Sequence, residues 1–158
     1  MALPGNRGRQ DPEVPSLVRI FCDADVLIAG AASTTGASHI LLQLSELTLL
    51  ECLASPHVIE EAERNLIAKL PEALSPFRLI VQAAVRVSPS APVWLARNLT
   101  GQAHSKDLPV LAAAISGRAD FLATFNTRDF RPRKVPPIIL QPKDVLVRIR
   151  RSLARILE

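Results

Sequence analysis

The sequence predicts an α/β protein whose central parallel sheet is covered by helices on both faces. Short apolar runs rich in β-branched residues alternate with longer segments whose apolar residues recur at helical spacing. The 13 Pro and 6 Gly of the 158-residue chain fall largely between these segments, as turn and cap residues do. Strands that alternate with helices form parallel sheets, because each crossover helix packs back onto the sheet that it connects.

The composition is that of one globular domain. At about 100–200 residues per domain the length allows one, and 48% apolar with 22% charged residues excludes global disorder. No apolar run reaches the roughly 18–20 residues of a membrane span. The N-terminus carries Arg and Pro where a signal peptide has its apolar core. We therefore expect a cytoplasmic protein without membrane association, with a flexible tail over residues 1–15 and one domain over residues 16–158.

Strands are expected at the apolar runs that are too short for a helix. Residues 16–22 and 121–125 are the clearest, because polar side chains follow each of them at once. The expected strands, in chain order, cover residues 16–22, 47–53, 85–87, 121–125 and 138–140.

Helices are expected where start and stop signals enclose apolar residues at helical spacing. Ser55 and Pro56 supply an N-cap and a first-turn proline, and Pro71 stops that helix. Gly117 is expected to cap the end of a later helix. The last helix carries apolar residues on one face, out to Leu153 and Ile156, and arginines on the other. The expected helices, in chain order, begin at residues 34–36, 55, 75, near 94, 108 and 142.

The C-terminal part of the chain is basic. Residues 128–158 hold nine Lys or Arg against three Asp or Glu, a charge of +6 in a chain of net charge +4. Arg makes up 15 of the 19 bases, and its planar fork suits phosphate. A polyanion such as RNA is one interpretation, and a solvated helix face is the other. The best candidates for RNA binding are Arg128, Arg131, Arg133 and Lys134.

Acidic and amide side chains lie where strands end or helices begin. In an open parallel sheet, ligands bind beyond the carboxyl ends of the strands, at the switch point of the strand order. Crowded carboxylates repel one another unless a cation neutralises them, and Mg²⁺ or Mn²⁺ prefers such oxygen ligands. An ion of this kind can activate water for displacement at phosphate. The alternative to a metal site is that each of these acidic and amide residues only caps a helix, makes a turn or faces solvent. The candidates are Asp23, Asp25, Glu61, Asp107, Asn126 and Asp129.

Four stretches of sequence resemble the PIN-domain ribonuclease family. FCDADVLIAG at residues 21–30 resembles its opening strand and first acid, and SPHVIEEAERNL at residues 55–66 its second acidic helix. The most specific stretch is KDLPVLAAAISGRADFLATFNTRDF at residues 106–130, an acid before an Ala-rich helix, then a strand and a turn of the T-x-N-x-x-D-F type. VPPIILQPKDVL at residues 135–146 is similar to the family's last strand and closing helix.

The resemblance implies a three-layer α/β/α sandwich around a parallel sheet of about five strands. It implies cleavage of RNA that depends on Mg²⁺ or Mn²⁺, as in the toxin of a VapBC-type toxin–antitoxin pair. An antitoxin partner and a homodimer follow from the same resemblance. Matched by position, Asp23, Glu61 and Asp107 are the metal acids. Thr124 orients water or a ligand through its hydroxyl, and Asp25 is accessory, because the family often has Asn there.

Asn126 departs from the strict family pattern, because many members carry a fourth acid at this position. An Asn oxygen can bind Mg²⁺ but brings no charge. Asp129, three residues later, is expected to complete the site through water if Asn126 does not. A catalytically impaired nucleic-acid-binding module is therefore the alternative to an active enzyme.

A receiver-type signalling domain is the competing interpretation from another class of protein. It is also a doubly wound domain with paired acids after its first strand. Its phosphoacceptor is an Asp at the end of the third strand, and residues 47–56 and 85–89 supply none.

Overall fold

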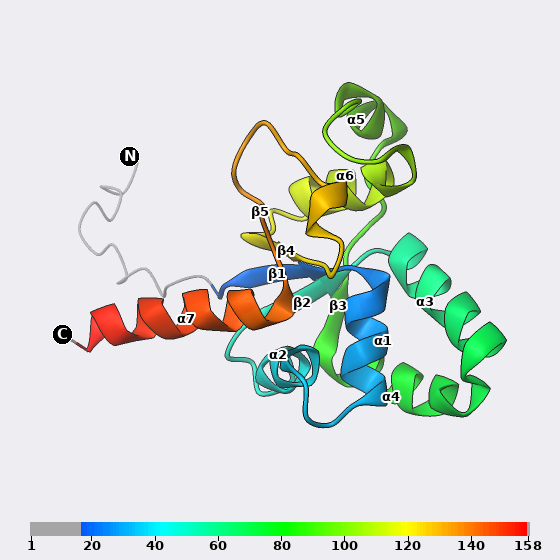
Figure 1. The fold of residues 1–158 in the computed structure, drawn as a ribbon, viewed down its shortest axis with the longest axis vertical. Helices are drawn as coiled ribbons and strands as arrows, with labels where there is room; N and C mark the ends of the chain where they lie inside the picture. The colour runs from blue at the N-terminus through cyan, green and yellow to red at the C-terminus, as the bar shows by residue number, and fades with distance from the viewer. Residues whose placement is uncertain (1–16, 158) are drawn as a thin grey trace, which may run out of the picture.

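The computed structural model describes residues 17–157, so the tail expected at residues 1–15 lies outside the described part of the chain. Strands and helices alternate along it, as the sequence predicts (Figure 1). The strands are β1 (Arg19–Cys22), β2 (Glu51–Ala54), β3 (Val85–Val87), β4 (Phe121–Ala123) and β5 (Ile138–Leu140). The α-helices are α1 (Ala24–Ala32), α2 (Ala37–Glu46), α3 (Pro56–Lys69), α4 (Leu74–Ala84), α5 (Val93–Asn98), α6 (Leu108–Ser116) and α7 (Pro142–Ile156), and the short 3₁₀ helices are η1 (Pro71–Ala73), η2 (Ser105–Asp107) and η3 (Thr127–Asp129).

The five strands form one all-parallel sheet in the order β3-β2-β1-β4-β5. From β1 the chain builds outward through β2 and β3, then returns to the other side of β1 for β4 and β5. The strand order therefore reverses between β1 and β4, where Cys22 pairs with Ala123. A parallel sheet leaves a crevice at such a point, beyond the carboxyl ends of the two strands.

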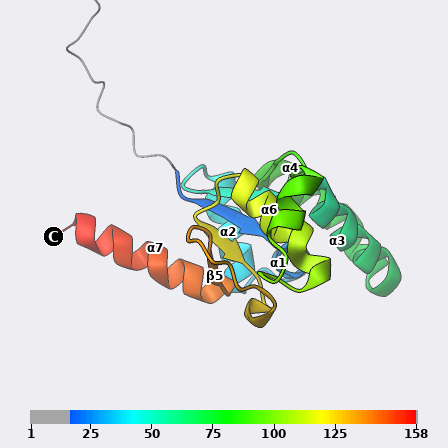
Figure 2. The same cartoon turned by 90° about the horizontal axis from the view of Figure 1, so that it is seen from above.

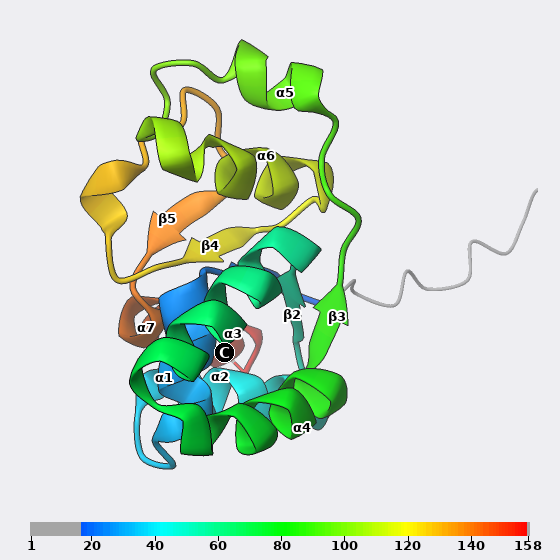
Figure 3. The same ribbon diagram turned by 90° about the vertical axis from the view of Figure 1, so that its right-hand side faces the viewer.

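Helices cover both faces of the sheet, which confirms the predicted three-layer α/β/α sandwich. Helices α5 and α6 pack together on one face, and α1, α2, α4 and α7 lie on the other, with α3 against α1 (Figures 1 and 3). The strand residues Ile20, Phe21 and Cys22 of β1 have no exposed surface. Burial on both faces explains why the strands read as continuous apolar runs in the sequence.

Helix α1 is the element to which sequence patterns assigned no structure. Its sequence ADVLIAGAA is almost wholly apolar, so it lacks the polar face by which a helix is recognised. The structure gives the reason, since α1 packs against three helices, α2, α3 and α4. Gly30 lies against Leu42 of α2 so closely that an added Cβ would overlap that side chain. The glycine therefore sets the close approach of the two helices.

Several predicted boundaries shift by a few residues. The strand expected at residues 47–53 is Glu51–Ala54, because residues 47–50 make the turn out of α2, with Thr48 at a φ of 60°. The strand expected at residues 16–22 begins at Arg19, and the one at residues 121–125 ends at Ala123. Helix α4 begins at Leu74, directly after η1. Helix α6 ends at Gly117 as predicted, but the left-handed residue is Arg118, with a φ of 54°.

The last helix, α7, forms as predicted, but its apolar face is not buried along its whole length. Val145 has no exposed surface, whereas Leu153 and Ile156 are 57% and 78% exposed. The reason is geometric: α7 crosses the domain and continues past it, so its last turns have no sheet beneath them (Figures 1 and 2). Among residues 17–157, no helix is long and apolar enough to cross a membrane.

Candidate metal and nucleic-acid site

Asp23 stands at the point where the strand order reverses. Its backbone N–H donates to the Ala123 carbonyl at 3.0 Å, which extends the pairing of β1 and β4 by one residue. Asp23 is also the N-cap of α1, and its Oδ1 accepts the Ala24 N–H at 2.9 Å. A short acid at this position caps the helix and still presents a carboxylate at the strand end.

Thr124 holds the second carboxylate oxygen of Asp23. The threonine follows β4 and has no exposed surface. Its hydroxyl donates to Asp23 Oδ2 at 2.9 Å and accepts the Asn126 N–H at 3.1 Å. The single hydroxyl thus joins the end of β1 to the turn after β4. In this arrangement its proton is directed to Asp23.

Glu61 and Asp107 reach the same edge of the sheet from α3 and η2. Of the three glutamates on α3, Glu63 pairs with Arg78 at 3.2 Å and Glu60 faces solvent. Glu61 is half-buried, and its charge acts on both Asp23 and Asp107.

Asp107 is the residue before α6, but its carboxylate makes no capping hydrogen bond to that helix. The alternative role of a simple helix cap therefore does not account for it. Its side chain is half-buried at the start of an Ala-rich helix.

The pKa values of Asp23 and Asp107 are both raised above the usual range of an aspartate. For Asp23, burial is the main cause, opposed by the hydrogen bonds from Thr124 and Ala24 and reinforced by the charges of Asp107 and Glu61. For Asp107, burial raises the pKa and Lys106 lowers it, while Asp129 and Glu61 raise it further. Four carboxylates from four segments therefore influence one another at this edge of the sheet.

Asn126, Asp129 and Asp25 differ in how they relate to these acids. Asn126 precedes η3 with an exposed side chain that makes no capping hydrogen bond. Asp129, at the end of η3, lies close enough to Asp107 to raise its pKa. Asp25 is exposed in the first turn of α1, where the positive end of the helix dipole stabilises a carboxylate. Asp25 is not among the acids that raise the pKa of Asp23 or Asp107.

No preformed metal cage exists in the described part of the chain. Within residues 17–157, no three Asp, Glu, His or Cys side chains are grouped closely enough to hold an ion. The donor set nevertheless fits a hard cation: the converging groups are carboxylates, with an amide and a hydroxyl nearby. Burial is the main cause of the raised pKa of both aspartates and neighbouring acids add to it, so a divalent cation bound here would stabilise their ionised forms.

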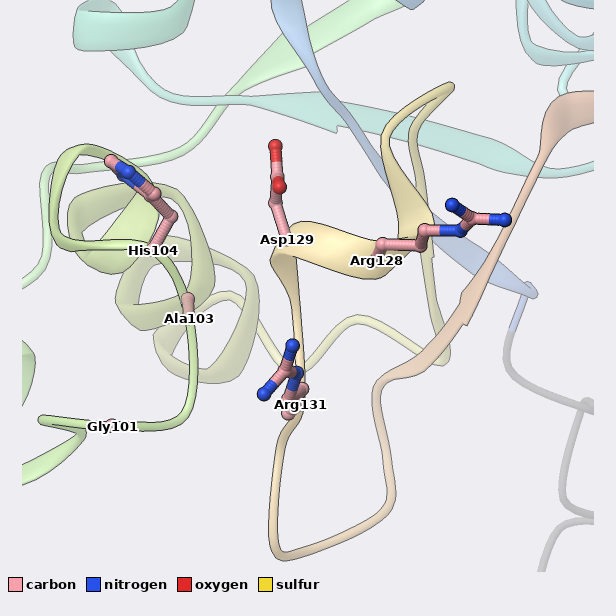
Figure 4. Close-up of a pocket in the computed structure, with 6 residues that line it drawn as sticks. All are labelled: Gly101, Ala103, His104, Arg128, Asp129 and Arg131. Carbon is pink, nitrogen blue, oxygen red and sulfur yellow. The ribbon is translucent and has the colours of Figure 1, made fainter.

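A pocket of about 210 Å³ has one of these acids, Asp129, in its lining (Figure 4). Figure 4 shows Asp129 and Arg131 facing the segment that ends at His104, with Arg128 on the other side of the same turn. Neither arginine forms an ion pair within residues 17–157. The lining residues are Gly101, Ala103, His104, Arg128, Asp129 and Arg131.

Backbone hydrogen bonds hold the two walls of this pocket together. The His104 N–H donates to the Asp129 carbonyl at 2.8 Å, and the Arg131 N–H to the Gln102 carbonyl at 2.6 Å. The nearly buried side chain of Gln102 accepts the Arg133 N–H at 2.9 Å. No sequence pattern points to His104 or Gln102 as a site residue, because only this long-range pairing brings them to the pocket. Arg133 and Lys134 are exposed on the following loop.

Comparison with known proteins identifies the family. A family model described as PIN domain matches residues 19–128, which include β1, α3, η2, α6 and β4. The chain belongs to the PIN domain family. PIN domains are typically nucleases, so the family agrees with the hydrolase that the sequence predicts. It also removes the receiver domain from consideration. No curated protein matches the chain.

Two solved structures resemble this PIN domain. One is VapBC2 from Rickettsia felis bound to a DNA fragment from its promoter, with a TM-score of 0.61 and 15% identity, covering 78% of this chain and 98% of that one. The other is VapC20 of Mycobacterium tuberculosis, described as a Sarcin-Ricin loop cleaving toxin, with a TM-score of 0.48 and 16% identity, covering 68% and 89%. At 15% identity, the likeness to VapBC2 concerns the fold.

Proposed function

We propose that this PIN domain is an endoribonuclease that depends on Mg²⁺ or Mn²⁺. The observation that carries the proposal is that Asp23, Glu61 and Asp107 lie at the edge of the sheet near its switch point, where burial and neighbouring acids raise the pKa values of both aspartates. These three acids are the proposed metal ligands, and Asn126 or Asp129 completes the set. The bound ion would lower the pKa of an attacking water and offset the negative charge that develops at the phosphate.

The chain's own residues divide the remaining tasks. Thr124 holds the Asp23 carboxylate in one orientation through the 2.9 Å hydrogen bond, so the acid does not have to be ordered when a ligand arrives. Asp23 and Asp107 must both be ionised to bind a cation, and each is fixed at the N-terminus of a helix, α1 for Asp23 and α6 for Asp107.

The proposed RNA contacts lie on the basic side of the site. Arg128 and Arg131 line the pocket beside Asp129 and have no acidic partner in the described residues, so their guanidinium groups are available to phosphate. His104 adds a further nitrogen donor at the opposite wall. The exposed Arg133 and Lys134 extend this surface along the next loop.

Cleavage of a mixed panel of structured and single-stranded RNAs tests the proposal. The wild-type protein should cut RNA with Mn²⁺ or Mg²⁺ and not with EDTA. Asp23→Asn and Asp107→Ala should each lose activity by a factor of about 10² or more, because each removes an electrostatic contact to the reacting centre. Glu61→Gln should do the same, and Glu60→Gln, a change on the neighbouring exposed residue, should leave the rate unchanged.

A thermal melt separates metal binding from catalysis. Mn²⁺ should raise the Tm of the wild-type protein and not that of Asp23→Asn, since only the folded acids bind the ion. Cleavage that is insensitive to EDTA and to all three substitutions would contradict the proposal. Salt-sensitive RNA binding without cleavage by the folded protein would instead favour the catalytically impaired binding module, the second candidate raised by Asn126.

We further propose that the nuclease is the toxin of a pair with an antitoxin protein. The support is the sequence resemblance together with the shared fold of VapBC2. Co-purification of the chain with the product of a neighbouring gene, and loss of cleavage in that complex, would support it; full activity of the co-purified complex would contradict it. The homodimer remains a prediction, and sedimentation that shows only monomer would contradict that.

A further inference from the structure

An apolar groove runs beside α7 at the amino-terminal edge of the sheet. It has a volume of about 320 Å³. Its floor comes from the starts of β1 and β4 and from the turn after α2, and its wall from α7 itself. Apolar residues that line it include Val18, Leu44, Leu49, Phe121, Ile149 and Leu153. The proposed nuclease site lies at the other end of the strands, beyond their carboxyl ends, so the groove is separate from it.

The apolar face of α7 continues beyond what the domain buries. Val145 has no exposed surface, Ile149 is half-buried, and Leu153 and Ile156 are 57% and 78% exposed. Across the groove Leu49 is 64% exposed. These residues form a contiguous stripe along one helix and are not scattered singly over the surface. A contiguous exposed apolar surface on a folded domain is typical of a binding site.

Three arginines lie on one side of α7, and the first of them, Arg148, lines the groove. Arg148, Arg151 and Arg155 recur at i, i+3 and i+7, which places them on one side of the helix. None of them forms an ion pair with another residue in the range 17–157. The groove is thus apolar in its floor and has the positive charge of Arg148 at its rim, with Arg155 and Arg151 further round the helix.

We propose that this α7 groove docks an acidic amphipathic helix of a partner protein. An apolar stripe with flanking charges at helical spacing is complementary to a helix with apolar residues at i, i+3, i+4 and i+7 and Glu or Asp beside them. The positive rim matches acidic side chains and steers them to the groove. The surface is independent of the nuclease proposal, because it lies away from Asp23 and Asp107.

Two other occupants fit the surface less well. RNA would gain contacts from the arginines, but the apolar floor offers no donors or acceptors to bases or phosphates. A second copy that placed its own α7 in the groove would bring Arg148, Arg151 and Arg155 against the same three arginines. Like charges at such an interface oppose association.

Binding of a designed peptide to the full chain tests the proposal. The probe is a fluorescein-labelled helical peptide of about 18 residues, roughly 27 Å long, with Leu at i, i+3, i+4 and i+7 and Glu at the flanking positions. A matched peptide with Lys in place of Glu is the control. Fluorescence anisotropy should show micromolar binding of the Glu peptide and at least about tenfold weaker binding of the Lys peptide.

Groove variants give the decisive comparison. Leu153→Gln is exposed enough to fold normally, which a melting curve checks, and it should weaken the Glu peptide by about tenfold or more. The double variant Arg148→Glu/Arg151→Glu should reverse the preference and bind the Lys peptide. Arg97→Glu on the distant α5 carries one charge reversal and should bind the Glu peptide as the wild type does.

Three results would overturn the proposal. The first is equal binding by the wild-type protein and both groove variants, or no binding of the Glu peptide at all. The second is a dimer of the wild-type chain in sedimentation that Leu153→Gln abolishes, which would assign the groove to a second copy. The third is displacement of the bound peptide by RNA at low micromolar concentration, which would assign the face to nucleic acid.

Discussion

At the scale of single residues, the site depends on how Asp23 is held. Its carboxylate is largely buried, which raises its pKa, and the hydrogen bonds from Thr124 and Ala24 oppose that rise. The Thr124 hydroxyl therefore favours the ionised form that a cation requires. The sequence resemblance singled out both residues, but it assigned the hydroxyl to water or a ligand. Only the pairing of β1 with β4 shows that it reaches Asp23.

Thr124→Val removes this hydroxyl and keeps the shape of the side chain. The pKa of Asp23 should rise further, because a hydrogen bond to its ionised form is lost. The protein should then need more Mn²⁺ for the same rise in Tm, and the acid limb of the cleavage rate should move to higher pH. Thr124→Ser retains the hydroxyl and should restore both. A Mn²⁺ titration followed by Tm, with pH–rate profiles of the three proteins, makes the comparison; identical Mn²⁺ midpoints for Val and Ser would disprove the role of this hydrogen bond.

At the scale of elements, helices with chemical end signals could be predicted and enclosed helices could not. Ser55 caps α3 by accepting the Val58 N–H, as expected, and Pro71 follows its end. Helix α1 has an apolar surface nearly all round, so its sequence carries no helical periodicity. It packs against α2, α3 and α4, all of which follow it in the chain, so its own sequence does not show this packing.

Gly30→Ala tests the close approach of α1 to α2. The added methyl overlaps the Leu42 side chain, so the substitution should lower stability by about 1–2 kcal/mol, the usual cost of overpacking less the gain in helix propensity. In a Leu42→Ala background the same change should cost less, because the overlap with Leu42 is gone and only the Ser38 carbonyl oxygen, 3.2 Å from the added Cβ, still crowds it. Chemical denaturation of the four proteins of this double-mutant cycle gives the coupling energy. Additive effects would show that the two side chains do not meet.

At the scale of the whole molecule, the positive charge is concentrated in the C-terminal part of the chain, but the basic residues that carry it lie in different regions of the fold. Arg128 and Arg131 line the pocket beside the acids, whereas Arg148, Arg151 and Arg155 follow α7. The count of nine bases in residues 128–158 cannot distinguish these two groups. The course of α7 past the domain separates them (Figure 2).

RNA affinity measured at several salt concentrations tests that separation. The background is the Asp23→Asn variant, which should not cleave RNA. In this background the logarithm of the RNA association constant should fall linearly with the logarithm of the salt concentration. Arg131→Ala should weaken binding and reduce the size of this slope by about 0.7–1, the share of one phosphate contact. Arg155→Ala removes the same charge from the far end of α7 and should leave the slope unchanged. Equal effects of the two substitutions would mean that RNA responds to net charge, not to the pocket.

The sequence alone determined the α/β class, most element positions, the acidic residues and the family resemblance, because apolar periodicity, caps and short motifs are local properties of the chain. The tertiary structure decided which acids lie at the same edge of the sheet. The reversal of strand order between β1 and β4 brings Asp23 and Thr124 together, although they are 101 positions apart. It also decided that His104 and Gln102 border the site, that α1 is an enclosed helix, and that the last turns of α7 are exposed. These properties depend on contacts between distant segments, and local sequence patterns do not encode which segments become neighbours.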